Sequence, residues 1–431
     1  METFRNVLNA FKLPDLRRKI LFTLAMLVVY RFAAHVPVPG VNAEALKQLF
    51  QSNQLLGLLD MFSGGAMSSF SVVAMGVYPY ITASIIMQLL VPLIPPLERL
   101  SKEGEAGQAK INQYMHIMTV PLAALQAITQ ISMFSGGAVP VIEGFNLLSP
   151  DTAVSSLATV ATLTAGTMFA VWLGELITEQ GVGNGVSIII FGGIVARIPQ
   201  RVAQDMRTNI PGLIAFVVIA VITVAAIVFI YEGQRRIPVQ YGKRVRGTKI
   251  YGGQSTHIPL KVNSAGMIPL IFGSSFLILP GVIASYFQYS SNQVVASVAQ
   301  GIVGLFDSQM VFYWLMYFIM VVGFTYFYTD VIFQQQNMPE NLQKHGGFIP
   351  GIRPGARTAE YLNRVLRRIT LVGALFLGIV AVLPFFVSKL TPMQTMIVTS
   401  TGLLIVVGVV IDTMKQLEAQ LLMRHYEGFL R

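Results

Sequence analysis

The sequence contains no cysteine and few charged residues. Without cysteine the chain can form neither disulfide bonds nor cysteine-ligated metal sites, and thiol chemistry is excluded. Only 12% of its 431 residues are charged, against about 25% in soluble domains, whereas 54% are hydrophobic. Because a charge at the centre of a bilayer costs about 2.5–3.5 kcal/mol on insertion scales, this composition is typical of a polytopic membrane protein.

Motifs of the common catalytic classes are also missing from the sequence. It has no HExxH zinc motif, no phosphate-binding GKS or GKT, and no GxSxG nucleophile motif. The histidines have no metal-ligand spacing; they are His35, His116, His257, His345 and His425. We therefore expect a protein that is not an enzyme and that holds no cofactor and no metal ion.

Ten hydrophobic segments approach the roughly 20 residues that a helix needs to cross a bilayer. They are Ile20–Val36, Val72–Ile94, Tyr114–Phe134, Ala153–Ile177, Val186–Ile198, Gly212–Tyr231, Asn263–Ile283, Met310–Asp330, Ile369–Val387 and Met393–Asp412. The fifth is short and follows the glycine-rich run Gly181–Gly185. We interpret that run as a break between two spans, because a dinucleotide-binding loop must follow a strand. The predicted fold class is an all-α polytopic membrane protein with ten transmembrane helices.

The 30 basic residues lie mostly on one side of these spans. They gather in the N-terminal segment, in two long loops at Glu232–Val262 and Val331–Arg368, and in the C-terminal tail. The other side has only Lys47, Arg197, Arg201, Arg207 and Lys389. By the positive-inside rule, both termini and both long loops are cytoplasmic. We read the first apolar segment as a retained span, because the residues after it form a weak cleavage site.

The first external loop, Asn42–Phe70, contains a short apolar piece at Leu55–Phe62, followed by Ser63, Gly64 and Gly65. It is too short to span a membrane. One interpretation is an interfacial helix on the membrane surface. The other is a re-entrant segment folded back into a cavity, since non-helical backbone at membrane depth is tolerated only inside protein or along a water-filled path.

Charged residues are scarce within the spans. Arg31 lies late in the first span, and Glu175, Glu232, Asp330 and Asp412 lie at or near the ends of theirs. Ion-coupled transporters place carboxylates or ion pairs at the midplane of the membrane. The sequence therefore argues against ion coupling and against an aspartyl intramembrane protease.

Isoleucines recur in the middle of the spans: Ile81, Ile85 and Ile86, then Ile188–Ile190, then Ile271. Any one of them fits a position that faces lipid or packs against a neighbouring helix. A ring of isoleucines from several helices would instead form a hydrophobic constriction that gates by dewetting. The residues alone leave both interpretations open.

The two long basic loops have the residue patterns of defined structure. Arg236–Tyr241 alternates apolar residues, Gly242–Gly247 carries three cations, and Thr248–Tyr251 resumes β-type residues, which predicts a hairpin with a basic tip. Gly346–Gly355 is dense in glycine and proline and predicts tight turns around Arg353. Charge that only sets topology and contacts anionic lipid is one explanation. An anionic partner, either ribosomal RNA or an acidic protein surface, explains the length of the loops better.

Several longer motifs together resemble the SecY/Sec61-alpha family, the central pore subunit of the Sec protein translocase. They run nearly from end to end of the chain. They are Val36–Gly40 (VPVPG), Met61–Gly65 (MFSGG), Tyr78–Leu89 (YPYITASIIMQL), Leu100–Glu105 (LSKEGE), Gly181–Phe191 (GVGNGVSIIIF), Glu232–Ile237 (EGQRRI), Gln254–Pro269 (QSTHIPLKVNSAGMIP) and Phe348–Thr358 (FIPGIRPGART).

The resemblance implies a clamshell of two pseudo-symmetric inverted halves around a central pore, residues 1–200 and residues 201–431. It places an apolar pore ring on Ile81, Ile85, Ile190, Ile271 and Ile405. It places a plug at about residues 60–70, including Asp60, Met61, Phe62, Ser63, Gly64, Gly65, Ala66 and Met67. A lateral gate toward lipid is expected between spans two and three and spans seven and eight, and we expect polar residues along it at Gln88, Ser274 and Ser275.

The resemblance also implies partners and a location. SecA or a ribosome would dock at Arg244, Arg246, Arg353 and Arg357. SecE and SecG are expected as small partner subunits, with secretory precursors, signal peptides and membrane lipids as further partners. The chain is expected in the bacterial cytoplasmic membrane, passing unfolded polypeptides and releasing hydrophobic segments into lipid.

Two other function classes compete with a passive channel. A secondary transporter for a small solute or lipid needs polar pairs within the membrane. A membrane protease or glycosyl transferase needs a paired carboxylate, Ser/Lys or His/Glu constellation in the spans. Neither pattern is evident in the sequence, and the chain itself contains no energy source.

Overall fold

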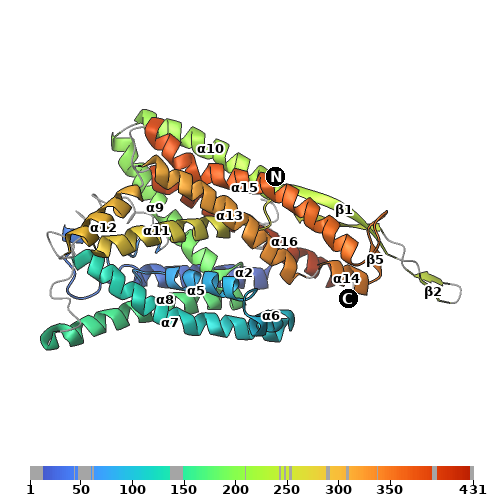
Figure 1. The fold of residues 1–431 in the computed structure, drawn as a ribbon, viewed down its shortest axis with the longest axis horizontal. Helices are drawn as coiled ribbons and strands as arrows, with labels where there is room; N and C mark the ends of the chain where they lie inside the picture. The colour runs from blue at the N-terminus through green and yellow to red at the C-terminus, as the bar shows by residue number, and fades with distance from the viewer. Residues whose placement is uncertain are drawn as a thin grey trace.

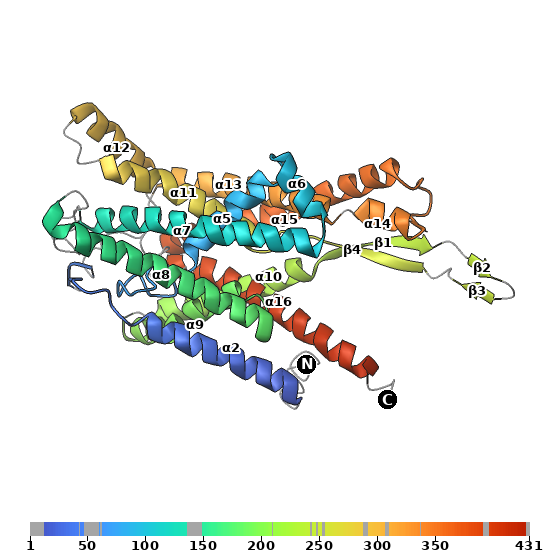
Figure 2. The same cartoon turned by 90° about the horizontal axis from the view of Figure 1, so that it is seen from below.

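The computed structural model describes residues 13–42, 44–46, 60, 63–135, 149–208, 210–241, 244–246, 249–251, 255–287, 292–306, 310–336, 338–390 and 396–427. Over these residues the chain is mainly helical, and its long helices run side by side in an elongated bundle (Figure 1). A small β structure projects from one end of the bundle (Figure 2). This end will be called the strand end.

The first group of helices comes from the N-terminal half of the chain. It consists of α2 (Pro14–Ala33), α5 (Tyr78–Leu90), α6 (Pro95–Lys102), α7 (Glu105–Ser135), α8 (Pro150–Gln180) and α9 (Gly185–Thr208). Helix α8 contacts α2, α5, α7 and α9, and so lies at the centre of the group.

The second group follows in the C-terminal half. It consists of α10 (Ile210–Glu232), α11 (Ile268–Phe287), α12 (Gln293–Leu305), α13 (Val311–Gln335), α14 (Met338–Lys344), α15 (Ala356–Leu390) and α16 (Met396–Glu427). Helices α11, α13, α15 and α16 contact one another in that order, and α10 closes against α15 and α16.

The two groups meet along two separate seams. On one seam α9 contacts α10, which follows it in sequence, and α16, which is the last helix of the chain. On the other seam α7 contacts α11. Buried side chains from both groups fill the space between the seams in one large apolar cluster. In Figure 1, α5, α7 and α8 lie on one side of this interface and α13 and α15 on the other.

Each of the ten predicted spans overlaps a helix, although the bounds differ. The helices are α2, α5, α7, α8, α9, α10, α11, α13, α15 and α16. Within the described residues, four helical stretches are individually long and apolar enough to cross a membrane, in α8, α10, α13 and α15, with a fifth if α5 and α6 form one broken span.

The prediction of one continuous second span over Val72–Ile94 was wrong. Residues 72–77 form turns, and the helix begins only at Tyr78. Gly76 has a φ of +54°, a left-handed conformation that glycine adopts without steric cost and that interrupts a right-handed helix. At the other end, α5 and α6 are bent by 100° relative to each other. The apolar segment is therefore a short helix between two breaks.

The two basic loops form one structure at the strand end. The predicted turns around Arg353 are present. The predicted hairpin is present with other strands: residues 236–240 pair with 255–259 instead of 248–251, and residues 244–246 of the expected tip form a strand. Strand β1 (Gln234–Tyr241) pairs antiparallel with β4 (Ser255–Lys261), and β2 (Arg244–Arg246) pairs with β3 (Lys249–Tyr251) toward the tip. Strand β5 (Gly347–Phe348), from the second loop, adds to the other edge of β1. Sequence analysis predicted each loop but not that they share a sheet.

Candidate functional site

The five isoleucines expected to form a ring lie in one buried cluster. Ile81 and Ile85 come from α5, Ile190 from α9, Ile271 from α11 and Ile405 from α16. None is more than 9% exposed. Two helices of each group therefore contribute to a single apolar contact region between the groups. Such a region offers neither hydrogen bonds nor charge to a molecule that passes through it.

The stretch before α5, residues 63–77, will be called the re-entrant segment. It contains no helix. Several of its side chains are fully buried, including those of Ala66, Phe70 and Val73. Its backbone pairs with the chain that leaves α2: Val38 N–H donates to the Phe70 carbonyl and Val72 N–H donates to the Val36 carbonyl, both at 3.0 Å.

The apolar piece at Leu55–Phe62, to which the two interpretations of the first external loop applied, lies outside the described residues except for Asp60. The residues that follow it are buried, as non-helical backbone at membrane depth must be. Ala66 belongs to the same apolar cluster as the isoleucines. Met61 and Phe62, two of the expected plug residues, lie outside the described residues. Asp60, Ser63, Gly64, Gly65 and Met67 are described, and of these Asp60, Ser63 and Met67 are buried.

An ion pair fixes the start of this segment to the first helix group. The Arg197 guanidinium of α9 pairs with the Asp60 carboxylate, whose side chain is only 3% exposed. The same guanidinium donates to the Gly65 carbonyl at 3.1 Å and to the Ser68 hydroxyl. A second carboxylate oxygen of Asp60 accepts from the Ser68 N–H at 2.9 Å. One arginine thus holds both ends of a tight turn.

Helix α2 supplies a second set of contacts to the same turn. Arg31 donates to the Gly64 carbonyl at 2.7 Å, and the buried Tyr30 hydroxyl donates to the Ser63 carbonyl at 2.8 Å. These bonds satisfy backbone carbonyls that a non-helical segment would otherwise leave without partners inside the protein. The turn is therefore held from α2 and α9 together.

The turn approaches α9 so closely that both contact positions must be glycine. A Cβ on Gly64 would lie 2.7 Å from the Cα of Gly193, and a Cβ on Gly193 would overlap the Cα of Gly64. Gly64 also has a φ of +64°, which side chains disfavour. Gly64 and Gly193 are thus explained by one backbone crossing, whereas a Cβ on Gly65 would meet the Arg197 guanidinium and one on Gly192 would meet the Leu27 side chain.

The expected gate residues lie on α11, which forms one side of the α7–α11 seam, and on α5, which packs against α7. Ser274 and Ser275 are buried on α11 and donate to the Ile271 carbonyl of their own helix at 2.9 and 2.8 Å. Gln88 on α5 donates to the Ser84 hydroxyl at 3.2 Å. One link between the groups is a side-chain hydrogen bond between Tyr78 of α5 and Ser275 of α11.

A cavity of about 360 Å³ separates the two groups near the strand end. It is lined by Val91, Pro92, Glu98, Ser101 and Lys102 from the first group and by Val331, Phe333, Gln334, Pro339, Glu340, Ala359 and Asn363 from the second. Lys102 pairs with Glu98 at 2.7 Å, and this hydrogen bond lowers the pKa of the Glu98 carboxyl below its ordinary value. The cavity lining mixes polar and apolar side chains, in contrast to the apolar cluster around the isoleucines.

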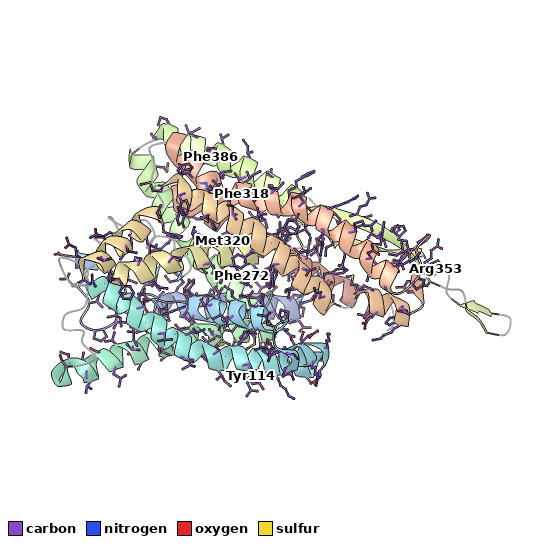
Figure 3. The ribbon with its side chains drawn as sticks, in the orientation of Figure 1. Tyr114, Phe272, Phe318, Met320, Arg353 and Phe386 are labelled. Carbon is purple, nitrogen blue, oxygen red and sulfur yellow. The ribbon has the colours of Figure 1, made fainter. Side chains whose placement is uncertain are left out.

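The expected docking arginines lie at the strand end. Arg353 is exposed in the glycine-rich turn, where its carbonyl accepts from the Thr358 hydroxyl at 3.0 Å, and Arg357 is exposed in the first turn of α15. Figure 3 shows Arg353 at this end and Phe386 toward the other. Arg244 and Arg246 flank Val245 on β2, opposite Tyr251 and Lys249 of β3.

A small apolar core lies at the strand end, next to the turn that carries Arg353. It joins buried residues of both basic loops with residues of α13, α14 and α15; they are Ile237, Val239, Leu260, Phe333, Leu342, Ile349, Leu362 and Leu366. Within the described residues, no three histidine or acidic side chains lie close enough to hold a metal ion.

Sequence analysis missed three functional candidates: Arg31, Arg197 and Tyr78. The two arginines were noted only as a span-end charge and as one of the few cations on the external side. The scarcity of cations on the external side could have indicated a role for these arginines, because a cation retained there is expected to have a partner. Tyr78 lies inside a quoted motif, but nothing in the local sequence indicates a partner on α11.

Comparison with known proteins agrees with this architecture. The SecY family model matches residues 71–414. Protein translocase subunit SecY of Halalkalibacterium halodurans is 45% identical over 442 residues, which cover 99% of this chain and 100% of that protein. A solved structure described as "The structure of a protein conducting channel" has a TM-score of 0.63 at 16% identity and covers 94% of this chain and 92% of that one. Sec61 in the canine ribosome–channel complex has a TM-score of 0.61 at 16% identity, with the same coverage.

Proposed function

Because the chain belongs to the SecY family, it is a multi-pass membrane protein that forms a protein-conducting channel, and we propose how its residues carry out that function. The observation that carries the proposal is the single buried cluster that joins Ile81, Ile85, Ile190, Ile271 and Ile405 across the two helix groups. These residues form the constriction of the pore. The two halves that move apart around it, residues 1–200 and residues 201–431, correspond to the N-terminal and C-terminal helix groups, with the boundary inside the last turns of α9.

The apolar character of the constriction suits a channel for many different polypeptides. A pore that passes any unfolded chain must not bind it tightly. Isoleucine side chains offer no hydrogen bond and no charge, yet they close around a moving chain and exclude water when it has left. The burial of all five supports a closed channel in this structure.

The re-entrant segment acts as the plug, seated against the constriction from the external side. Its position in the same apolar cluster through Ala66 supports this role. Arg197 and Arg31 hold the plug through Asp60 and the carbonyls of Gly64 and Gly65. Displacing the plug therefore requires breaking a partly buried ion pair, which keeps the resting channel sealed.

The α7–α11 seam is the lateral gate, and the α9–α10–α16 seam is the hinge. Fewer residues contact one another across the gate seam than across the hinge seam. The Tyr78–Ser275 hydrogen bond is one of the contacts across the gate. Gln88, Ser274 and Ser275 lie along it. A hydrophobic signal segment that enters the open seam leaves toward lipid, because burial of each methylene is worth about 0.8 kcal/mol.

The strand end is the cytoplasmic docking platform. A partner that supplies energy, either the SecA ATPase or a translating ribosome, contacts Arg244, Arg246, Arg353 and Arg357. The apolar core next to the turn that carries Arg353 and the ribosome-bound state of a structural relative support this assignment. SecE and SecG accompany the chain in the bacterial cytoplasmic membrane, with both termini on the cytoplasmic side, and secretory precursors with signal peptides are the substrates.

The test is export of a signal-bearing precursor into vesicles that contain this chain, SecE, SecA and ATP. We expect the precursor to become protected from external protease, and protection to fall at least tenfold in Arg353→Glu. Lys344→Glu makes the same charge change on a nearby exposed helix and should export normally. Failure of the wild-type channel to export, with the protein correctly inserted, would refute the proposal.

A further inference from the structure

Tyr231 lies where three helices of the second group meet. It stands at the end of α10 and is only 6% exposed. Its hydroxyl donates to the Asp412 carboxylate of α16 at 2.7 Å. Its ring lies against Gly408 of the same helix, where an added Cβ would be 3.9 Å from the ring and from the hydroxyl oxygen. Gly266, just before α11, is also close, since a Cβ there would lie 3.5 Å from the hydroxyl oxygen.

These contacts lead to the two constriction isoleucines of the second group. Ile405 precedes Asp412 by seven residues, close to two helical turns, so both lie on one face of α16. On the other side, the residue after Gly266 is Met267, whose carbonyl accepts from the Ile271 N–H at 3.5 Å. The tyrosine therefore contacts α16 and the start of α11 close to the residues that each helix contributes to the buried cluster.

The hydrogen bond between Tyr231 and Asp412 gives this junction a fixed geometry. Apolar surroundings alone do not, because hydrophobic attraction is non-directional and lets packed helices slide. Ile227, one turn before the tyrosine on α10, is buried in the same apolar cluster as the constriction isoleucines. A hydrogen bond to an ionised carboxylate is about twice as strong as one between neutral groups. It therefore sets both the distance and the rotation of α16 relative to α10.

A second pair joins the same two helices further from Ile405. Lys415 of α16 pairs with Glu232 of α10 at 2.8 Å, and the lysine ammonium lies 5.9 Å from the centre of the Tyr231 ring. The lysine and glutamate side chains are 35% and 54% exposed. Ion pairs with this exposure contribute little, because water screens the charges and two long side chains must be ordered. The pair is thus a matched control on the same helices.

We propose that Tyr231 and Asp412 are positioning residues of the constriction. Their hydrogen bond holds α16 against α10 and the start of α11, so that Ile405 and Ile271 stay where they meet the isoleucines of the first group. Without it, α16 rotates or slides while the helices remain packed, and Ile405 spends more time outside the cluster. The inference rests on the proposed role of the isoleucines as the constriction of the pore, and it adds the residues that hold two of them in place.

The test is the accessibility of a single thiol at position 405. Because the chain has no cysteine, Ile405→Cys gives one reactive group, at a position that is 1% exposed. The full chain with its accompanying subunits is reconstituted in vesicles without a precursor, and the rate of reaction with a water-soluble maleimide is measured. We expect Tyr231→Phe to raise this rate about tenfold, as the loss of a hydrogen bond to a charged acceptor predicts. Lys415→Met, in the same Ile405→Cys background, should leave it unchanged.

Variants of the partner residue separate positioning from general stability. Asp412→Asn keeps an acceptor for the tyrosine hydroxyl, so it should raise the labelling rate less than Asp412→Ala does, even where both lower the melting temperature. Unchanged labelling in Tyr231→Phe, or an equal rise in Lys415→Met, would overturn the proposal. Labelling rates that follow the melting temperature across all four variants would also overturn it, in favour of a purely stabilising contact. The assay needs neither precursor nor ATP, so a failure to export counts against the proposed function alone.

Discussion

Arg197 and Asp60 lie 137 positions apart in sequence and form an ion pair that fixes the turn at the start of the re-entrant segment, the proposed plug, to helix α9. The Asp60 side chain is almost fully buried and that of Arg197 is 23% exposed. Removing one partner of such a pair leaves the other charge without compensation, at a cost on the order of 3 kcal/mol. The closed channel should therefore depend on both residues together.

We predict that Arg197→Gln raises the resting ion conductance of the channel in planar bilayers, because the plug leaves its seat more often. Asp60→Asn should do the same. The double variant should conduct little more than either single variant, since the same interaction is lost once. Additive increases would show that the two residues act separately.

The Gly64–Gly193 crossing gives a second test of the seat, with a matched control. Gly64→Ala places a methyl group 2.7 Å from the Cα of Gly193, so the plug cannot reach its position and resting conductance should rise. Gly40 has a similar left-handed φ of +82° but no atom within 4 Å of an added Cβ. Gly40→Ala should cost only the backbone strain of about 1–2 kcal/mol. Equal conductance in the two variants would contradict the seat.

Shortening a constriction residue should widen the pore. Ile271→Ala removes three methyl or methylene carbons from the buried cluster between the halves, and we expect higher conductance when a precursor is stalled in the channel. Ile283 lies on the same helix but is 53% exposed, so Ile283→Ala should have no effect on conductance. Thermal unfolding of both variants checks that Ile271→Ala, which costs about 2–5 kcal/mol, remains folded.

The helices and the hairpin could be predicted from the sequence, but the contacts between distant segments could not. Hydrophobic length predicted ten helices, because burial in lipid requires a continuous apolar segment. It failed at residues 72–77, where hydropathy is high but Gly76 breaks the helix. The basic hairpin followed from local alternation, whereas its pairing with Gly347–Phe348 did not, since that contact joins segments about a hundred residues apart.

The same limit applies to the site. The resemblance named five isoleucines as a pore ring, and all five lie in one buried cluster, because motif position carries information about distant contacts. No motif indicated that Arg31 and Arg197 both reach the turn at Gly64–Gly65. That arrangement depends on how α2 and α9 pack around a non-helical segment, and such packing leaves no periodic pattern in the sequence.

The last prediction concerns the gate. Tyr78→Phe keeps the ring and removes the hydroxyl that bonds to Ser275 across the seam between the halves. A neutral buried hydrogen bond contributes about 1 kcal/mol, so the ratio of open to closed gate should rise about fivefold. Because the chain has no cysteine, spin labels at Leu93→Cys and Phe276→Cys report the distance across the gate without background labelling.

The expected result is a larger share of long distances between the two labels in Tyr78→Phe. Tyr114 is a tyrosine on the outer face of α7 that is 44% exposed, and Tyr114→Phe should leave the distances unchanged (Figure 3). The same variant should export precursors with weakened signal segments better than the wild type, because less of their binding free energy is then needed to open the seam. Unchanged distances in Tyr78→Phe would show that the hydrogen bond to Ser275 does not hold the gate closed.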